Sequence, residues 1–301
     1  MQTVPCGHSD RPVPDSAAAL RAGPGARRPL RVQMRRAASV QRRLLPDLSP
    51  PVGGFQLASL YWPCETLGGD IYDLVCRRDG AILLVADVMG HGPEAALISM
   101  LVKGAFQAAV ATTWDPARLL DDMHRRLRRM LPDPLFVAAA VARLRPQRLS
   151  IDLANAGLPH PFVLRTPAPR VEELPLNGLP LGLLEARRCA EHDECSIRLE
   201  PRDVLLLASD GLGAITRGQG ERFEDKRMRD ALRRLAGRDG RAVLEGLAAD
   251  ATDFGNGRCL QDDVNLVAVT CTGAPEQAVS PARRSIDLGR GERKEWCGRE
   301  R

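Results

Sequence analysis

The sequence predicts an α+β fold in which helices cover antiparallel sheets. Two observations lead to this prediction. Strand-like and helix-like segments come in blocks, and the middle of the chain is a run of short strands separated by turn sequences, as in a β meander. Strict alternation of strands and helices would instead indicate a doubly wound parallel sheet. We find no internal repeat, and one domain of about 220 residues accounts for the patterned part of the chain.

The composition is that of an ordinary globular protein with two atypical ends. The 301 residues are 44% hydrophobic and 27% charged, and the net charge is +5. Residues 1–31 hold an excess of arginine without apolar periodicity and are predicted to be a disordered basic tail. Residues 273–301 are predicted to be a second disordered tail. Between them we expect a linker or switch helix over residues 32–50 and a folded domain over residues 51–272.

The eight cysteines and the lengths of the apolar runs indicate the cellular compartment in which we expect the protein. No Cys-x-x-Cys spacing and no secretory signal are present, so we expect neither a zinc site nor a disulfide framework, but buried thiols in a reducing cytoplasm. The apolar stretches are far shorter than the roughly 20 residues that cross a bilayer, so no membrane span is expected. The arginine-rich start lacks a recognition fold and interleaved aromatic residues, so we expect no nucleic-acid partner.

The elements of the first half follow from periodicity and from helix breakers. A short helix is predicted over Val32–Leu45 and ends at Pro46. Two amphipathic helices are predicted further on: Pro93–Ala111, with proline in its first turn, and a helix that has Asp115 as its N-cap and stops at Pro132. Between the first helix and these two we expect three strands, over Phe55–Tyr61, Ile71–Cys76 and Ala81–Ala86.

The second half is predicted to be strand-rich at first and helical toward its end. Val204–Ala208 is a fully apolar strand that follows a Pro/Gly-rich loop, and Val264–Thr270 is the last strand. Two amphipathic helices are expected between them, over Glu224–Ala236 and Arg241–Asp250. The meander before the loop comprises strands over Leu135–Leu144, Arg148–Ala154 and Pro161–Leu164.

Four aspartate signatures are spread along this framework, each beside glycines or at the edge of an apolar run. They are Gly68-Gly69-Asp70, Asp87-Val88-Met89-Gly90-His91-Gly92, Ser209-Asp210-Gly211 and Asp262-Asp263. Asp87 and Asp210 end buried strands, and Asp70 and Asp262 stand just before strands, so all four can reach one end of a sheet. Such an anionic cluster repels itself unless cations bind it. Carboxylates without cysteine or histidine ligands favour hard cations such as Mg²⁺ or Mn²⁺, a chemistry that suits hydrolysis of phosphate esters.

Each signature alone also has a simpler explanation, because Asp-Gly after a strand is a common turn. Four signatures in this order favour the metal site. Further motifs lie between them, and together with them they form the ordered series Gly68–Asp73, Asp87–Gly92 with Glu94–Ala96, Asn155–Gly157, Leu181–Leu183, Ser209–Gly211 and Asp262–Val264.

This series resembles the motifs of PPM-type serine/threonine protein phosphatases of the bacterial SpoIIE/RsbU family, from about Gln41 to Thr270. The resemblance implies two antiparallel β-sheets sandwiched between α-helices, with a centre of two Mn²⁺ or Mg²⁺ ions at one edge. It makes residues 51–272 a PPM-type phosphatase catalytic domain. In such a site the ions activate a water and neutralise the phosphoryl oxygens, so that no protein nucleophile, and no cysteine, is needed.

The resemblance also implies roles for individual residues. Asp87 is implied to bridge both ions, with the backbone carbonyl of Val88 assisting. Asp210 and Asp262 are implied to hold one ion, and Asp70 to complete the other side, directly or through water. Activity is expected to depend most on Asp87 and Asp210.

Other residues near these motifs are less certain members of the site. Asp73 and Asp263 are further candidate ligands, and Tyr72 is expected to pack rather than to take part in the chemistry. A histidine could protonate the leaving oxygen. His91 is the first candidate, although a solvent-facing loop position is the favoured interpretation, and His124 is expected at the surface.

Three positions depart from the family pattern. The family commonly has Asn-Ala-Gly-His, whereas Leu158 follows Gly157 here and His160 comes two places later, which puts a role of that histidine in doubt. Ser209 and Asn265 replace frequent threonines and are expected to tune hydrogen bonds without removing ligands. We therefore expect an active enzyme.

The resemblance implies hydrolysis of phosphoserine or phosphothreonine on a small anti-anti-sigma protein of the STAS type, in a partner-switching pathway that controls a sigma factor and a stress response. Relatives often carry a sensor or receiver domain ahead of the catalytic one, whereas mostly basic residues precede it here. We therefore expect Val32–Leu45 either to dimerise, to dock on a separate regulator, or to be a frayed linker. The alternative function is a catalytically inactive phosphatase fold that binds a phosphoprotein, and the intact aspartates argue against it.

Overall fold

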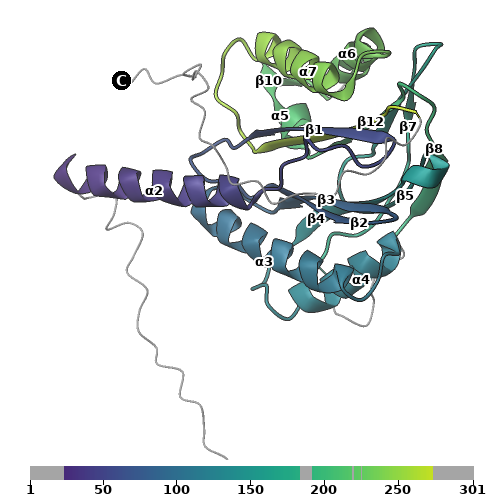
Figure 1. The fold of residues 1–301 in the computed structure, drawn as a ribbon. Helices are drawn as coiled ribbons and strands as arrows, with labels where there is room; N and C mark the ends of the chain where they lie inside the picture. Colours follow the sequence, from purple (N-terminus) through teal and green to yellow (C-terminus); the bar gives the residue numbers. More distant parts are fainter. Residues whose placement is uncertain (1–23, 184–191, 219, 225, 274–301) are drawn as a thin grey trace, which may run out of the picture.

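Two five-stranded antiparallel sheets lie face to face in the computed structural model, and helices cover both outer faces (Figure 1). The structure describes residues 24–183, 192–218, 220–224 and 226–273, with side chains from residue 29 onward. The predicted α+β class and the helix-covered antiparallel sheets are confirmed.

The first sheet has the strand order β1-β12-β9-β6-β7, and the second has the order β2-β3-β4-β5-β8. The strands of the first sheet are β1 Phe55–Trp62, β12 Val264–Cys271, β9 Val204–Ala208, β6 Phe162–Arg165 and β7 Arg170–Glu173. Those of the second are β2 Ile71–Arg77, β3 Gly80–Val88, β4 Val137–Arg145, β5 Ser150–Ala156 and β8 Glu194–Arg198.

Each sheet is covered by its own pair of helices, which lie above and below the sandwich in Figure 1. Helices α3 (Gly92–Val110) and α4 (Pro116–Leu127) pack on the second sheet, and α6 (Lys226–Leu235) and α7 (Gly240–Phe254) pack on the first. Asp115 caps α4 as predicted, because its side chain accepts a hydrogen bond from the Arg118 N–H at 2.9 Å.

Three apolar layers result from this arrangement: one between the sheets and one beneath each helix pair. Strand β3 shows why its sequence is a continuous apolar run. Leu83 and Val85 point between the sheets, whereas Leu84 and Ala86 point toward α3 and α4, so both faces of the strand are buried. Tyr72 is buried between the sheets, as its expected packing role requires.

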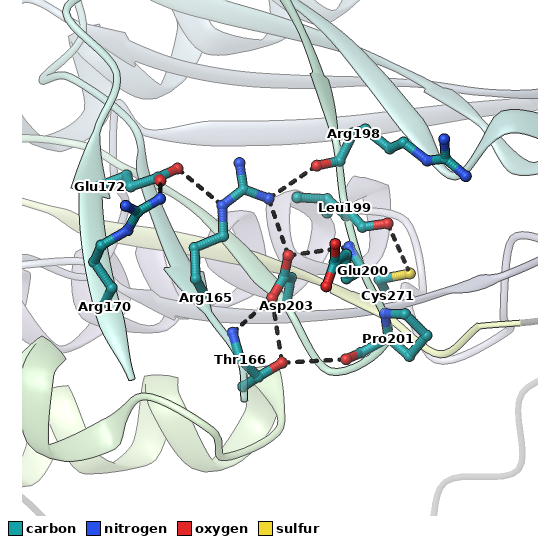
Figure 2. A network of polar contacts seen from close by, with 10 residues as sticks. All are labelled: Arg165, Thr166, Arg170, Glu172, Arg198, Leu199, Glu200, Pro201, Asp203 and Cys271. Atoms are coloured by element: carbon teal, nitrogen blue, oxygen red, sulfur yellow. Dashed lines mark hydrogen bonds and ion pairs between the residues drawn. The ribbon is translucent and has the colours of Figure 1, made fainter. Parts of the chain in front are cut away.

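A network of hydrogen bonds and ion pairs connects the strands and loops at one end of the sandwich, where β9 begins (Figure 2). The Asp203 carboxylate is 1% exposed and accepts hydrogen bonds from the Arg165 guanidinium at 2.9 Å, the Thr166 N–H at 2.8 Å and the Glu200 N–H at 3.0 Å. Arg165 in turn donates to Glu172 at 2.8 Å and to the Arg198 carbonyl at 2.8 Å. The buried charge of Asp203 is therefore fully compensated by neighbouring donors.

Several elements differ from the predicted ones. Helix α2 spans Pro24–Leu44 and begins before Val32, so residues 24–31 of the predicted disordered tail are helical; the remainder of both predicted tails lies outside the described residues. The sequence pattern did not reveal the edge strands β7 and β8, because their residues are polar and only half-buried. It also missed the short segments α5 (Gly211–Ala214), β10 (Thr216–Arg217) and β11 (Glu221–Arg222).

The expectation that the cysteines are buried is wrong for most of those described. Only Cys271 is buried, Cys64 and Cys195 are partly exposed, and Cys76 and Cys259 are exposed. Small side chains at strand ends and in loops stay accessible even when their neighbours are packed. None of the described helices combines the length and the apolar character that a bilayer crossing requires.

Candidate metal centre

The four predicted aspartates gather at the end of the sandwich opposite the Asp203 network. Asp70 precedes β2 and Asp87 lies near the end of β3, whereas Asp210 follows β9 and Asp262 precedes β12. Two carboxylates therefore come from each sheet, which corrects the expectation that all four lie at the end of one sheet. Their exposure increases from the buried Asp70 through the half-buried Asp87 and Asp262 to the exposed Asp210. The cluster thus opens from the interior toward solvent.

Asp70 and Asp87 form the interior half of this cluster. Asp70 is 2% exposed and accepts a hydrogen bond from the Ser209 hydroxyl at 2.7 Å. Burial, and next the charge of Asp87, hold the pKa of Asp70 well above its usual range. Burial and the nearby charge of Asp210 raise the pKa of Asp87 to about 7. When ionised, each of the two carboxyl groups therefore disfavours the ionised form of the other.

Asp210 and Asp262 form the solvent-facing half. Lost hydration and the charge of Asp262 raise the pKa of Asp210, while the Arg222 guanidinium opposes the rise. A side chain at Gly211 would bring its Cβ within 1.9 Å of the Asp263 carbonyl oxygen. Only glycine permits this close approach between the turn after β9 and the start of β12, and the approach brings the two carboxylates together.

Asp263, a further candidate ligand, has a different task in the structure. Its carboxylate accepts hydrogen bonds from the Cys64 N–H at 2.7 Å and from the Gly69 N–H at 2.6 Å, and the residue is 2% exposed. Both of its oxygens are thus engaged by backbone donors. Asp263 fixes the loop before Asp70 and is a positioning residue.

Asp73, the other further candidate, points away from the cluster. Because side chains alternate along β2, it faces α3, where it pairs with Lys103 at 2.6 Å and accepts from Gln107 at 2.6 Å. The prediction that Asp73 could be a ligand is therefore wrong.

The Val88 carbonyl lies beside the glycine segment that precedes Asp70. A Cβ on Gly69 would lie 3.1 Å from the Val88 carbonyl oxygen and 2.8 Å from the Ala95 Cβ, so the segment is closely packed against the end of β3. The Tyr61 hydroxyl is buried nearby without a hydrogen-bond partner among the described residues. Burial and the charge of Asp263 raise the pKa of Tyr61.

The histidines take positions away from the carboxylates. His91 precedes α3 in an exposed loop and pairs with Glu65 at 2.8 Å, in agreement with the favoured loop interpretation. His160 contacts Glu173 at 3.1 Å and Asn177 at 3.3 Å, on the first sheet. The expectation that His124 lies at the surface is wrong, because it is 2% exposed and accepts from the Gly182 N–H at 3.2 Å.

Three hydrogen bonds connect Ser209 and Asn265 to each other and to the residues around Asp70. Ser209 and Asn265, the two departures from the family pattern, are joined across β9 and β12: the Asn265 N–H donates to the Ser209 hydroxyl oxygen at 2.9 Å, and that hydroxyl donates to Asp70. The Asn265 amide also donates to the Ile71 carbonyl at 3.0 Å. These departures therefore orient Asp70, which the residue types alone did not indicate.

Helix α2 reaches the glycine segment through Gln41. The Gln41 side chain donates to the Gly68 carbonyl at 2.6 Å and accepts from the Gly68 N–H at 3.3 Å. Ala38 of α2 packs beside it against Leu67 and Ala96. The last turns of α2 are thus attached to the residues immediately before Asp70, while its first turns project from the sandwich (Figure 1).

The donor chemistry of the site fits divalent cations. Asp70, Asp87 and Asp210 each have a raised pKa in which a neighbouring carboxylate takes part, so added positive charge would relieve the mutual repulsion. Carboxylates and a backbone carbonyl are also the oxygen ligands that Mg²⁺ and Mn²⁺ prefer. Within the described ranges, however, no three acidic, histidine or cysteine side chains converge into a ready-made ligand set. Small shifts of these side chains would have to accompany binding.

The two-sheet sandwich with helices outside is the PP2C-type phosphatase fold. The PP2C domain of SiaA from Pseudomonas aeruginosa has the same fold, with a TM-score of 0.72 and 24% sequence identity over 81% of this chain and 98% of that domain. The RsbU and RsbW domains of Rv1364c from Mycobacterium tuberculosis give a TM-score of 0.63 and 23% identity, over 75% of this chain and 62% of that one. This class was predicted from the ordered motifs.

Residues 77–272 match the family model of stage II sporulation protein E, and the chain belongs to this SpoIIE family. It is 24% identical to the phosphoserine phosphatase RsbU of Bacillus subtilis (strain 168) over 188 residues, which are 62% of this chain and 55% of RsbU. It is 28% identical to the phosphoserine phosphatase RsbP of the same organism over 164 residues, 52% of this chain and 39% of RsbP. The chain spans about half the length of RsbU and less of RsbP.

Proposed function

We propose that this protein is a metal-dependent protein serine/threonine phosphatase that hydrolyses phosphoserine or phosphothreonine with a metal-activated water. The observation that carries the proposal is the placement of four aspartates, two from each sheet, at one end of a PP2C-type fold, where burial and neighbouring carboxylates raise the pKa of Asp70, Asp87 and Asp210. Asp87 would bridge two Mn²⁺ or Mg²⁺ ions with the Val88 carbonyl assisting. Asp210 and Asp262 would hold one ion and Asp70 the other.

When bound, the ions would supply charge neutralisation for the phosphoryl group and lower the pKa of water. The protein's own residues prepare the site for this. The Ser209 hydroxyl donates to Asp70 and stabilises its ionised form, in which Asp70 could act as a ligand. Arg222 supplies positive charge beside Asp210 at the open side of the cluster.

The proposed substrate is a phosphorylated anti-anti-sigma protein of the STAS type in a cytoplasmic partner-switching pathway. Support comes from family membership and from the likeness to RsbU and RsbP. Dephosphorylation of such a protein would let it capture an anti-sigma factor and release the sigma factor. A homodimer or a separate regulator acting through α2 is the proposed mode of control, since Gln41 connects that helix to Gly68.

One observation favours a second candidate, a phosphatase fold that binds a phosphoprotein without turnover. The described side chains do not form a preassembled set of three metal ligands. This candidate would bind the phosphoprotein and remain inactive at every metal concentration.

The test offers the purified chain a phosphorylated STAS protein with and without Mn²⁺, beside the variant Asp210→Asn. We expect phosphate release that depends on Mn²⁺ and is lost in the variant. Binding of the phosphoprotein without any release would support the second candidate, and unchanged activity in the variant would contradict the ligand set.

A further inference from the structure

A groove opens beside the candidate metal centre, on the side of the first sheet. Its volume is about 430 Å³. Its walls come from the end of β1, the segment after α5, the end of α7 and the loop that leads to β12. Four segments far apart in the sequence therefore build it.

Several residues that line the groove are neighbours, in sequence or through a hydrogen bond, of residues in the carboxylate cluster. Gln261 lines the groove and directly precedes Asp262. Cys64 lines it too, and its N–H donates to Asp263 at 2.7 Å. Ile215 lies just after α5, the short helix that begins behind Asp210. Since an extended chain advances about 3.3 Å per residue, a peptide whose phosphoserine occupied the centre would bring its neighbouring side chains to this groove.

The lining combines apolar surface with one unpaired cation. Trp62, Ile215 and Leu260 are partly exposed apolar side chains in the groove. Arg258 is exposed at the same place, and among the described residues no carboxylate lies within 4.0 Å of its guanidinium. Arg222, by contrast, pairs with Glu224 at 2.8 Å. The groove thus suits a segment that carries an apolar side chain and a negative charge.

We propose that this groove binds the residues flanking the phosphoserine of the protein substrate, and that it selects an apolar side chain followed or preceded by an acidic one. The inference rests on the proposed phosphatase function and deepens it, because it assigns substrate selectivity to residues outside the metal ligands. Arg258 pairs with the acidic residue of the substrate, and the wall of Trp62, Ile215 and Leu260 holds the apolar one.

The test compares three substrates in the presence of Mn²⁺: p-nitrophenyl phosphate, a phosphoserine peptide with leucine and aspartate beside the phosphoserine, and the same peptide with glycine in their place. For the unaltered protein we expect kcat/KM to be at least about tenfold higher for the first peptide than for the second, since one apolar side chain in a pocket discriminates to that extent. Equal values for the two peptides, or hydrolysis of p-nitrophenyl phosphate with no turnover of either peptide, would overturn the groove proposal alone. No Mn²⁺-dependent hydrolysis of any substrate would overturn the proposed function and this inference with it.

Two variants locate the selectivity. Thr252→Trp fills the groove from α7, and Arg258→Glu reverses its charge; each is expected to remove most of the preference while p-nitrophenyl phosphate hydrolysis stays within about twofold. Glu245→Trp, on the exposed face of the same helix and outside the groove, is the matched control and should keep the preference. Calorimetric titration of the leucine–aspartate peptide into Asp210→Asn, with and without Thr252→Trp, gives a readout independent of turnover. Equal Kd values in that pair would contradict the proposal.

Discussion

The two ends of strand β9 carry aspartates in opposite circumstances. Asp203, before the strand, is 1% exposed and surrounded by donors from Arg165, Thr166 and Glu200. Asp210, after the strand, meets other carboxylates, which raise its pKa. One end of the strand therefore has a compensated negative charge, and the other has an excess of it.

At the Asp203 end, hydrogen bonds and an ion pair stabilise the fold. At the Asp210 end, repulsion between neighbouring carboxylates is electrostatically unfavourable. Buried charge is tolerated only when hydrogen bonds or ions compensate it. At the Asp203 end the protein supplies the compensation itself. At the Asp210 end, the described residues contribute the Ser209 hydroxyl and the Arg222 guanidinium, and three carboxyl groups still have a raised pKa. Cations in the proposed metal site would supply further compensation.

The largest expected effect is on activity. Asp210→Asn should lower Mn²⁺-dependent phosphatase activity by at least about a hundredfold, because one ligand charge that stabilises several kcal/mol of transition-state charge is lost. The metal-free protein should be no less stable than the unaltered one, since a repulsive charge is removed. Steady-state kinetics and thermal unfolding in a chelator measure the two effects; a clear loss of stability would contradict the comparison.

Asp203→Ala should have the opposite effects: it should lower the stability of the fold and leave the activity nearly unchanged. Removing one partner of a buried, hydrogen-bonded ion pair costs about 3 kcal/mol in the free energy of unfolding, at the low end of the usual range because Arg165 is partly exposed. Urea unfolding measures this cost. Activity per folded molecule should stay within about twofold at low temperature, and a large drop in kcat would show that the two ends are not independent.

Much of this comparison could be predicted from sequence, but unevenly. Asp70, Asp87, Asp210 and Asp262 could be grouped from sequence because each stands beside glycines or at the edge of an apolar run, a local signal that is visible without structure. Asp203 also stands at the edge of an apolar run, but the sequence did not indicate its partners, since Arg165 and Thr166 lie at the end of another strand that only the strand order brings beside β9. Asp73 was misjudged for a related reason: its distance along the chain from Asp70 is short, yet strand alternation turns it toward Lys103.

The fold was predicted where apolar periodicity is strong and missed where it is weak. Strands such as β3 and β9 were placed closely, because they are buried on both faces. Edge strand β8 was missed because alternate residues face solvent and none of its residues is fully buried. His124 was misplaced on an arginine-rich helix face, because the contact that buries it comes from Gly182 of a distant loop.

A smaller effect should follow from the residue that orients Asp70. Ser209→Ala removes the hydroxyl that donates to Asp70 at 2.7 Å, and loss of such a supporting contact commonly weakens metal affinity about 10- to 100-fold. The Mn²⁺ concentration for half-maximal activity should rise accordingly, with little change in kcat at saturating Mn²⁺. Ser209→Thr keeps the hydroxyl and should restore most of the affinity; failure of threonine to do so would show that packing, rather than the hydrogen bond, matters here.

The smallest effect is expected from the contact of α2 with the glycine segment. Gln41→Ala removes two hydrogen bonds to Gly68 and should lower the apparent Mn²⁺ affinity by roughly five- to tenfold, in line with about 0.5 to 0.7 kcal/mol for each hydrogen bond. Gln33→Ala, exposed on the same helix, is the matched control. Equal apparent Mn²⁺ affinities for the two variants would show that the contact of α2 with Gly68 does not influence the site.

Each sheet contributes two of the four carboxylates. The distance between the two pairs of proposed metal ligands therefore depends on how the two sheets pack against each other. The apolar layer between them, with Leu83, Val85, Leu205 and Val267, acts as a spacer whose thickness fixes that distance. Changing the volume of a side chain in this layer would alter the separation of Asp87 from Asp210 without touching either residue. The packing of the sandwich interior would therefore set the spacing of the proposed metal pair, in addition to stabilising the fold.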